Sequence, residues 1–140
     1  DVRRHWNGFR MLHPNQFEVN EAWIAFRLNR APIRTEDDGE FNCTALMDAA
    51  SCFILCTELI AVAAAEPTQL EFRRLLKNAQ SHRQQLPKTL FVPREDVIDV
   101  LACEATRQGI EVLPVSESEL LVFIGEPRQE FTEQFGEDPR

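Results

Sequence analysis

Four acidic residues are the candidates for a metal centre in this sequence: Asp48, Glu58, Glu95 and Asp96. Carboxylate oxygens are the donors that Mg²⁺ prefers, and paired carboxylates hold the metal ions of phosphoryl-transfer enzymes. These positions also have ordinary structural explanations. Asp48 begins a predicted turn, and Glu95 and Asp96 fall in the predicted first turn of a helix, where the helix dipole favours acids. We therefore expect no metal site and no catalytic residue, with the four-carboxylate cluster as the alternative.

Five basic residues between positions 71 and 88 are the candidates for contact with an anion. They are Arg73, Arg74, Lys77, Arg83 and Lys88, with Glu71 as the one acid among them. The chain as a whole has 15 Lys and Arg against 23 Asp and Glu, a formal net charge of −8. Such an acidic protein gains no overall attraction to the nucleic-acid backbone. A solvated helix face explains the basic segment, and we do not expect a nucleic-acid binder.

The four cysteines lack the spacing of a metal site. Cys43, Cys52, Cys56 and Cys103 contain no CxxC pair and no neighbouring histidines, so zinc is not expected. A nucleophilic cysteine needs a nearby histidine, and nothing in the sequence brings His82 to one of them. We expect reduced, structural thiols in a cytoplasmic protein.

The sequence has no motif typical of cofactor binding and no apolar segment long enough to span a membrane. There is no glycine-rich phosphate loop, no GxSxG and no HExxH, and the chain has five glycines in all. The longest apolar run covers positions 61–65, far short of the ~20 residues of a membrane span. No stretch has the pattern of a signal peptide. We expect no cofactor and no membrane association.

The length of 140 residues and a hydrophobic content of 44% predict one globular domain. We expect an N-terminal arm over residues 1–16, whose aromatic residues dock on a single domain over residues 17–140. Residues 17–28 read as a strand, and the apolar run 22–26 predicts that both of its faces are buried. Residues 29–40, with a proline, a glycine and several acids, read as an exposed connection.

Two short apolar runs, 44–47 and 53–56, flank the turn-forming segment 48–51 and predict a hairpin. If Asp48 and Ser51 face each other, Cys43 lies directly opposite Cys56. Cβ atoms of such a pair are ~4.5–5.5 Å apart, wider than a relaxed disulfide. We therefore predict adjacent free thiols that act as small apolar contacts, rather than a redox switch.

The second half of the sequence alternates helices and strands. Phe72, Leu75, Leu76 and Ala79 have the spacing of one buried helical face, and residues 89–92 form a short buried strand. A second helix buries Val97, Ile98, Leu101, Ala102 and Ala105 and ends at Gly109.

A strand over residues 110–115 follows, and Pro114 suits the edge of a sheet. Ser116 and Glu119 form a capping box for a helix over residues 120–124, which Gly125 and Pro127 are expected to break. A final acidic helical segment carries Phe131 and Phe135, either packed on the domain or free for a partner.

This element order predicts a five-stranded mixed sheet, three strands antiparallel and two parallel, with helices on both faces. It resembles the ribonuclease H-like fold over roughly residues 20–115. Integrase and transposase cores of that superfamily have a hairpin of the form apolar-apolar-apolar-Asp-x-x-Ser, which Ala45-Leu46-Met47-Asp48-Ala49-Ala50-Ser51 matches. Their Gly-Ile-x-Val is matched by Gly109-Ile110-Glu111-Val112. The chain also resembles a bacterial domain family that has the same layout and no established activity.

The resemblance implies a degenerate site. In the integrase-like enzymes one catalytic Asp lies midway along the first strand and another at the end of the fourth. Here residues 23–27 contain no acid, and the fourth strand ends in Val92-Pro93. We therefore expect a non-catalytic interaction or accessory module, which binds a protein partner or its own copy. The alternative is a metal-dependent nuclease or phosphoryl-transfer enzyme with relocated carboxylates.

Overall fold

The strand at the centre of the sheet is β1 (Ala22–Arg27), as its apolar residues predict. The computed structural model describes residues 12–29, 33–35, 39–61, 69–83, 85–94 and 99–135. Within them, β1 pairs antiparallel with β3 (Gly39–Asp48) on one side and parallel with β5 (Thr89–Pro93) on the other. Every side chain from Ala22 to Phe26 is buried. The strand is thus enclosed in the plane of the sheet as well as above and below it.

The described sheet has six strands, one more than the sequence predicts. The main path is β2-β3-β1-β5-β6, and β4 (Ile54–Ala61) pairs with β3. The pairs of β3 with β4 and with β2 are antiparallel, whereas β6 (Glu111–Val115) is parallel to β5. The extra strand is β2 (Ile33–Thr35), which lies in the segment expected to be a connection. Its pairing with β3 brings Thr35 opposite Gly39, whose φ of +90° suits glycine.

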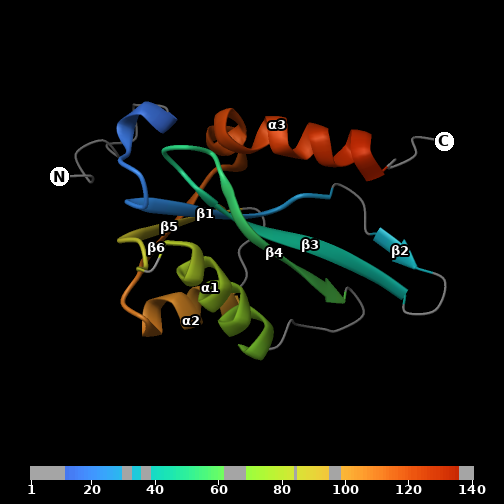
Figure 1. Cartoon of the computed structure of the whole chain (residues 1–140), viewed down its shortest axis with the longest axis horizontal. Coiled ribbons are helices and arrows are strands. Elements are labelled where there is room, and N and C mark those ends of the chain that lie inside the picture. The colour runs from blue at the N-terminus through green and yellow to red at the C-terminus, as the bar shows by residue number, and fades with distance from the viewer. Residues whose placement is uncertain are drawn as a thin grey trace.

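Helices cover both faces of the sheet, as predicted (Figure 1). On one face, α3 (Glu117–Phe135) packs Leu120, Phe123 and Ile124 into a cluster with Ile24 and Phe26 of β1. On the other, α1 (Gln69–Arg83) and α2 (Asp99–Arg107) pack against a second cluster. The alternation of side chains along β1 supplies both clusters, because Trp23 and Ala25 point away from Ile24 and Phe26.

The predicted helical faces of α1 and α2 are confirmed where they are described. Phe72, Leu75, Leu76 and Ala79 are all fully buried on α1. On α2, Leu101 and Ala105 are buried and Ala102 is half-buried, whereas Val97 and Ile98 lie outside the described residues. Gly109 has a φ of +89° just after α2, the left-handed conformation that ends a helix.

The predicted break of the last helix is wrong, since α3 continues through Gly125 and Pro127. A proline inside a helix removes one hydrogen bond and costs ~3 kcal/mol. Contacts on both sides of Pro127 offset that cost. Phe123 is buried before it, and Phe131 packs against the same cluster after it. The side chain of Phe135 lies outside the described residues.

The predicted register of the β3–β4 hairpin is also wrong. Cys43 lies opposite Leu59, and Cys56 lies opposite Leu46. Two features shift the register: Cys52 takes a left-handed φ of +60° in a turn closed by Asp48 N–H and Phe53 C=O, and the pairing is irregular at Leu46/Met47. Cys43 therefore belongs to the cluster under α3, while Cys56 packs on the cluster under α1.

The end of the predicted N-terminal arm is attached to the domain. Residues 1–11 lie outside the described part of the chain. A short 3-10 turn, η2 (Pro14–Gln16), is capped by the His13 side chain, and Leu12 and Phe17 on either side are buried. Phe17 makes an edge-on contact with Phe91, with ring centroids 5.7 Å apart.

We expect Leu75→Ala to lower the free energy of unfolding by about 2–5 kcal/mol, since it leaves a cavity in a fully buried layer. The matched control is Leu121→Ala, because Leu121 is exposed on α3. It should change stability by less than ~0.5 kcal/mol. Urea denaturation measures both, and equal losses would contradict the described packing of α1.

Candidate functional site

The carboxyl ends of the neighbouring parallel strands β1 and β5 are the natural place for a site in this sheet. Open α/β sheets bind ligands beyond the carboxyl ends of their strands, where adjacent connections diverge. A small cavity lies here, lined by Ala25, Phe26, Arg27, Thr44, Val92, Pro93 and Leu101. Its volume of about 10 Å³ is close to the space that one water molecule needs. The space that the described residues enclose is too small for a nucleotide.

The polar groups of this cavity come from a cross-strand pair. Arg27 at the end of β1 lies opposite Thr44 of β3. Thr44 is buried, and the Nε of Arg27 is buried without a hydrogen bond to any described residue. Among the described lining residues there is no carboxylate. The arrangement can donate hydrogen bonds to a single small acceptor, and its positive charge repels a divalent cation.

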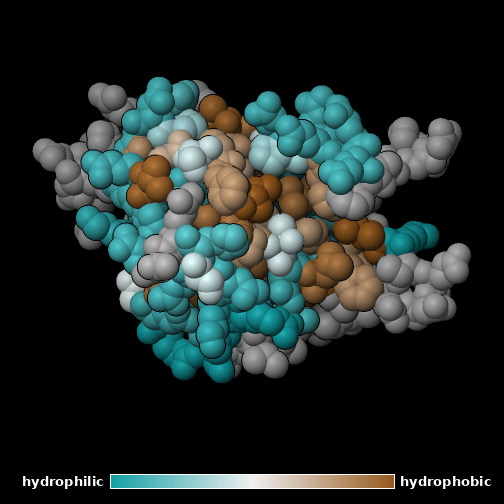
Figure 2. All heavy atoms as spheres, viewed as in Figure 1, coloured by the Kyte–Doolittle hydropathy of each residue, from teal (hydrophilic) through white to brown (hydrophobic). Residues whose placement is uncertain are grey.

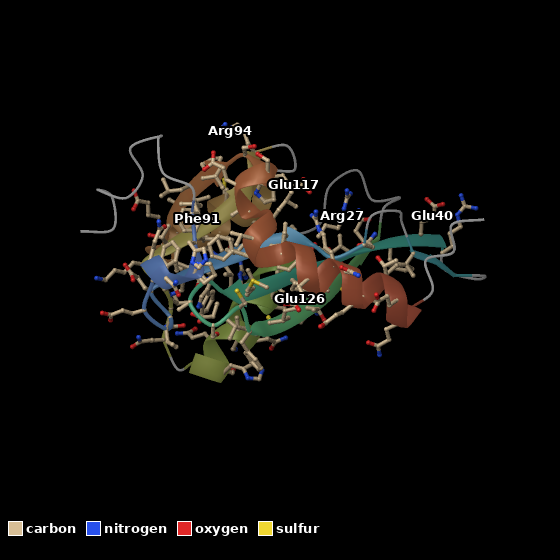
Figure 3. All side chains as sticks on the ribbon, turned by 90° about the horizontal axis from the view of Figure 1, so that it is seen from above. Arg27, Glu40, Phe91, Arg94, Glu117 and Glu126 are labelled. Atoms are coloured by element: carbon tan, nitrogen blue, oxygen red, sulfur yellow. The ribbon has the colours of Figure 1, made fainter. Side chains whose placement is uncertain are left out.

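A second arginine near this end of β1 holds α3 in place. Arg128 donates from Nε to the carbonyl of Arg27 at 2.8 Å and lies over the Phe26 ring, 5.9 Å from its centroid. Its guanidinium also pairs with Glu117 at the start of α3. Figure 3 looks onto α3 from above, with Glu117 near the start of the helix and Glu126 farther along. The charges of Arg128 and Glu117 therefore serve the packing of α3 on the sheet.

The structure separates two of the four candidate metal ligands. Asp48 ends β3 opposite Trp23, whereas Glu58 lies opposite Thr44, four residues earlier on the same strand. That separation corresponds to about 13 Å along the strand. Glu95 and Asp96 lie outside the described residues. Within the described part of the chain, no three His, Cys, Asp or Glu side chains are grouped as a metal site.

Asp48 has a structural task at the hairpin turn. Its carboxylate is fully buried and accepts the backbone N–H of Asn20 at 2.6 Å. It also accepts the backbone N–H and the hydroxyl of Ser51, at 2.9 and 2.7 Å. Asn20, at a left-handed φ of 67°, in turn accepts the indole N–H of Trp23. This network ties the turn to the start of β1, in agreement with the turn role that the sequence indicates.

Three of the five basic candidates, Arg73, Arg74 and Lys77, are exposed on α1. Arg73 pairs with the buried Glu104 of α2, and Arg74 pairs with Glu58 at 2.8 Å. Lys77 is exposed on α1, and Lys88 is exposed at the beginning of β5. The side chain of Arg83 lies outside the described residues. Two of the five charges are thus already engaged with carboxylates, and the prediction of an anion contact stays untested.

Glu104 is the charged residue that the sequence reasoning missed. It is buried to 1% exposure and accepts from Arg107 and Gln108 at 2.9 Å, in addition to Arg73. The spacing of Glu104 from Arg107 and Gln108, three and four residues along α2, was the available signal. The contact with α1 could not be read from the sequence. The bond from Arg73 links α1 to α2.

A second, larger hollow lies near the starts of β1 and β5. Its volume is about 420 Å³, and it is lined by Glu18, Val19, Asn20, Glu21, Gln85, Leu86 and Lys88. The amide of Asn20 already donates to the carbonyl of Gln85, and Glu21 accepts the backbone N–H of Glu18. The side chains of Asn20 and Glu21 thus bind backbone groups of the hollow's own rim.

All four cysteines are free. Burial raises the pKa of the Cys43 thiol. Burial also raises the pKa of Cys52, with further contributions from the Asp48 and Glu126 carboxylates. Burial, with the nearby Glu58 carboxylate, raises the pKa of Cys56 to about 11. Raised pKa values keep these three thiols protonated and unreactive at neutral pH. The predicted free thiols are confirmed, but the predicted contact between Cys43 and Cys56 is not.

Comparisons with known proteins leave the family open. No protein-family model matches the chain, and no curated protein is significantly similar to it. Among solved structures, a chain of the simian T-cell lymphotropic virus intasome, in complex with the PP2A regulatory subunit B56 gamma, shares 13% identity at a TM-score of 0.49. The match covers 93% of this chain and 46% of that chain.

A second structure, Endonuclease V from Bacillus subtilis, also shares 13% identity, at a TM-score of 0.27. The match covers 65% of this chain and 38% of that one. This chain therefore spans less than half the length of either structure. At such values, neither assigns an activity. No helix in the described residues is long and apolar enough to cross a membrane.

We expect Asp48→Ala to lower the free energy of unfolding by about 2–4 kcal/mol, because it leaves buried N–H donors without an acceptor. Glu58→Ala removes a carboxylate whose Arg74 partner is half-exposed, and it should cost less than ~1 kcal/mol. Thermal and urea denaturation test the pair. A small effect of Asp48→Ala would show that the turn does not depend on this carboxylate.

Cys56 should make stability fall at alkaline pH. Its thiol titrates near 9.0 in the unfolded chain and near 11 in the folded protein. Between these values the unfolded chain loses its proton first, so stability falls as pH rises through this window. The melting temperature of the wild-type protein should drop more steeply from pH 8 to 10.5 than that of Cys56→Ala. Parallel pH profiles would mean that the pKa of Cys56 is not raised.

Proposed function

We propose that this chain is a non-catalytic interaction module on a ribonuclease H-like scaffold. Leaving β2 aside, the strand order β4-β3-β1-β5-β6, with β3 antiparallel and β5 and β6 parallel to β1, supports the scaffold. It is the layout that the sequence resemblance implies, with β2 as an addition. Helices on both faces of the sheet agree with it. Its free thiols are consistent with action in the cytoplasm.

The observation that carries the proposal is the chemistry at the carboxyl ends of β1 and β5. Resemblance to the integrase-like enzymes implies metal-binding carboxylates in the middle of β1 and at the end of β5. Here these places hold Ala25, Val92 and Pro93, with the cation Arg27 beside them. Two-metal phosphoryl transfer needs carboxylates that neutralise and orient the metal ions. The lining residues that the structure describes offer none.

The alternative is a metal-dependent nuclease with relocated carboxylates. Its support is the position of Glu95 and Asp96 in the sequence, directly after Arg94 at the end of β5. A catalytic site there would need further carboxylates from neighbouring segments, and neither Arg27 at the end of β1 nor Thr44 of β3 opposite it supplies one.

Titration with Mn²⁺ and an assay for cleavage of single- and double-stranded DNA and RNA test this proposal. We expect no saturable Mn²⁺ binding below ~1 mM and no cleavage, because the described lining of the cavity provides no carboxylate donors. Metal-dependent cleavage that the double variant Glu95→Gln, Asp96→Asn abolishes would establish the alternative instead. Glu58→Gln serves as the control variant, because Glu58 lies on a different strand and is paired with Arg74.

A further inference from the structure

The edge strand β4 offers backbone hydrogen-bonding groups along its outer side. Among the described strands, it pairs with β3 alone. Cys43 accepts the N–H of Leu28, so its backbone faces β1, and the backbone groups of its neighbours Asn42 and Thr44 face β4. Their partners Ile60 and Glu58 are therefore bonded to β3. By the same alternation, the N–H and C=O groups of Thr57 and Leu59 point outward.

Nothing in the sequence of β4 protects this edge. Strands at sheet edges are usually shielded by proline, lysine or an irregularity that twists them away. From Cys56 to Ala61 the pairing with β3 is regular, and this stretch contains no proline and no lysine. Its one charge, Glu58, is neutralised by Arg74 of α1. The opposite edge differs: β6 carries Pro114, which cannot donate to an added strand.

Apolar side chains are exposed on the same edge. Leu59 is 56% exposed on β4, and Phe53 is 53% exposed at the turn that leads into it. Figure 2 views this side of the molecule and shows apolar residues in a band across the middle, between α3 above and α1 and α2 below. An extended strand added to β4 would cover part of this band.

We propose that β4 pairs antiparallel with β4 of a second copy of this chain and joins the two sheets into one. The inference rests on the proposed function as an interaction module and names its partner. Residues whose backbone N–H and C=O groups point outward must pair with each other across the two strands. The two-fold axis between the copies therefore passes through Thr57, Glu58 or Leu59. An axis through Glu58 would set two like charges directly opposite, which is unfavourable. An axis through Thr57 would bring Leu59 against the irregular start of the partner strand.

The axis through Leu59 is the register that fits. It packs the exposed Leu59 against its own copy and sets Glu58 opposite Ile60 of the second copy. Six backbone hydrogen bonds then join Thr57, Leu59 and Ala61 to the second strand. Each Glu58 then lies about 8 Å from Glu58 of the second copy, and its own Arg74 partner offsets the repulsion between the two carboxylates.

Analytical ultracentrifugation of the full chain tests the proposal. We expect a dimer with a dissociation constant of about 1–100 µM, typical of a small interface. Dimerisation should strengthen as salt rises from 0.05 to 0.5 M, because salt screens the repulsion between two chains of charge −8. A chain that is monomeric at all concentrations up to ~500 µM would overturn the proposal, as would a dimer that weakens with salt.

Leu59→Lys places a charge on the two-fold axis and should weaken the dimer at least about tenfold. Leu121→Lys is the matched control, since Leu121 is 51% exposed on α3, and its dimer should be unchanged. Circular dichroism verifies that both variants are folded. Equal dimerisation of wild type and Leu59→Lys would place the interface elsewhere and overturn the proposal.

Amide hydrogen exchange gives a readout without any substitution. The N–H groups of Glu58 and Ile60 should be protected at every concentration, because they bond to β3. Those of Thr57 and Leu59 should become protected only as the dimer forms. Equal exchange of Thr57 and Leu59 in dilute and concentrated samples would overturn the proposal. Metal-dependent cleavage, by contrast, would overturn the proposed function and leave these tests of the edge unaffected.

Discussion

The enclosure of β1 is the constraint on which the rest of the structure depends. This strand is paired on both sides within the sheet and covered by α3 on one face and by α1 and α2 on the other. An ionised carboxylate in its middle would lose its hydration without a partner, at a cost of several kcal/mol. A metal site could offset that cost only with further carboxylates nearby. Trp23, Ile24 and Ala25 instead complete the two apolar clusters, so the position that could hold catalysis contributes to stability.

The same apolar patterns explain why much of the fold was predictable. The apolar run in β1 predicted a central strand that is buried on both faces, and the 3.6-residue period of apolar residues identified the buried face of α1. Tertiary contacts decided what the sequence could not. Pro127 is a local signal to end a helix, but the packing of Phe123 and Phe131 on the sheet outweighs it. The register of the hairpin depends on the left-handed Cys52 and on the irregular pairing at Leu46/Met47, which no turn rule for Asp48 and Ser51 specifies.

The contacts of charged residues were less predictable than the burial of apolar residues, because the partners of the charges lie far away in the sequence. The turn role of Asp48 could be inferred from its neighbours in the sequence, yet its shortest hydrogen bond is to the backbone N–H of Asn20, 28 residues earlier. In the sequence, Arg73 and Arg74 were candidates for a basic surface. In the fold, they pair with Glu104 of α2 and with Glu58 of β4. Arg27 belongs to the candidate site only because the sheet sets it opposite Thr44. Residue type alone therefore did not reveal which charges the fold pairs with each other.

The two edges of the sheet show how function could remain in a scaffold without a catalytic centre. Glu111 N–H donates to Lys88 C=O, so alternation points the nitrogen of Pro114 outward, where an added strand would require a donor. On the other side, β4 presents outward N–H groups and the exposed Leu59, with its charge neutralised by α1. An unprotected edge carries a risk of aggregation, which selection ordinarily removes. Protection of one edge and not the other is consistent with β4 being a surface that a specific strand covers.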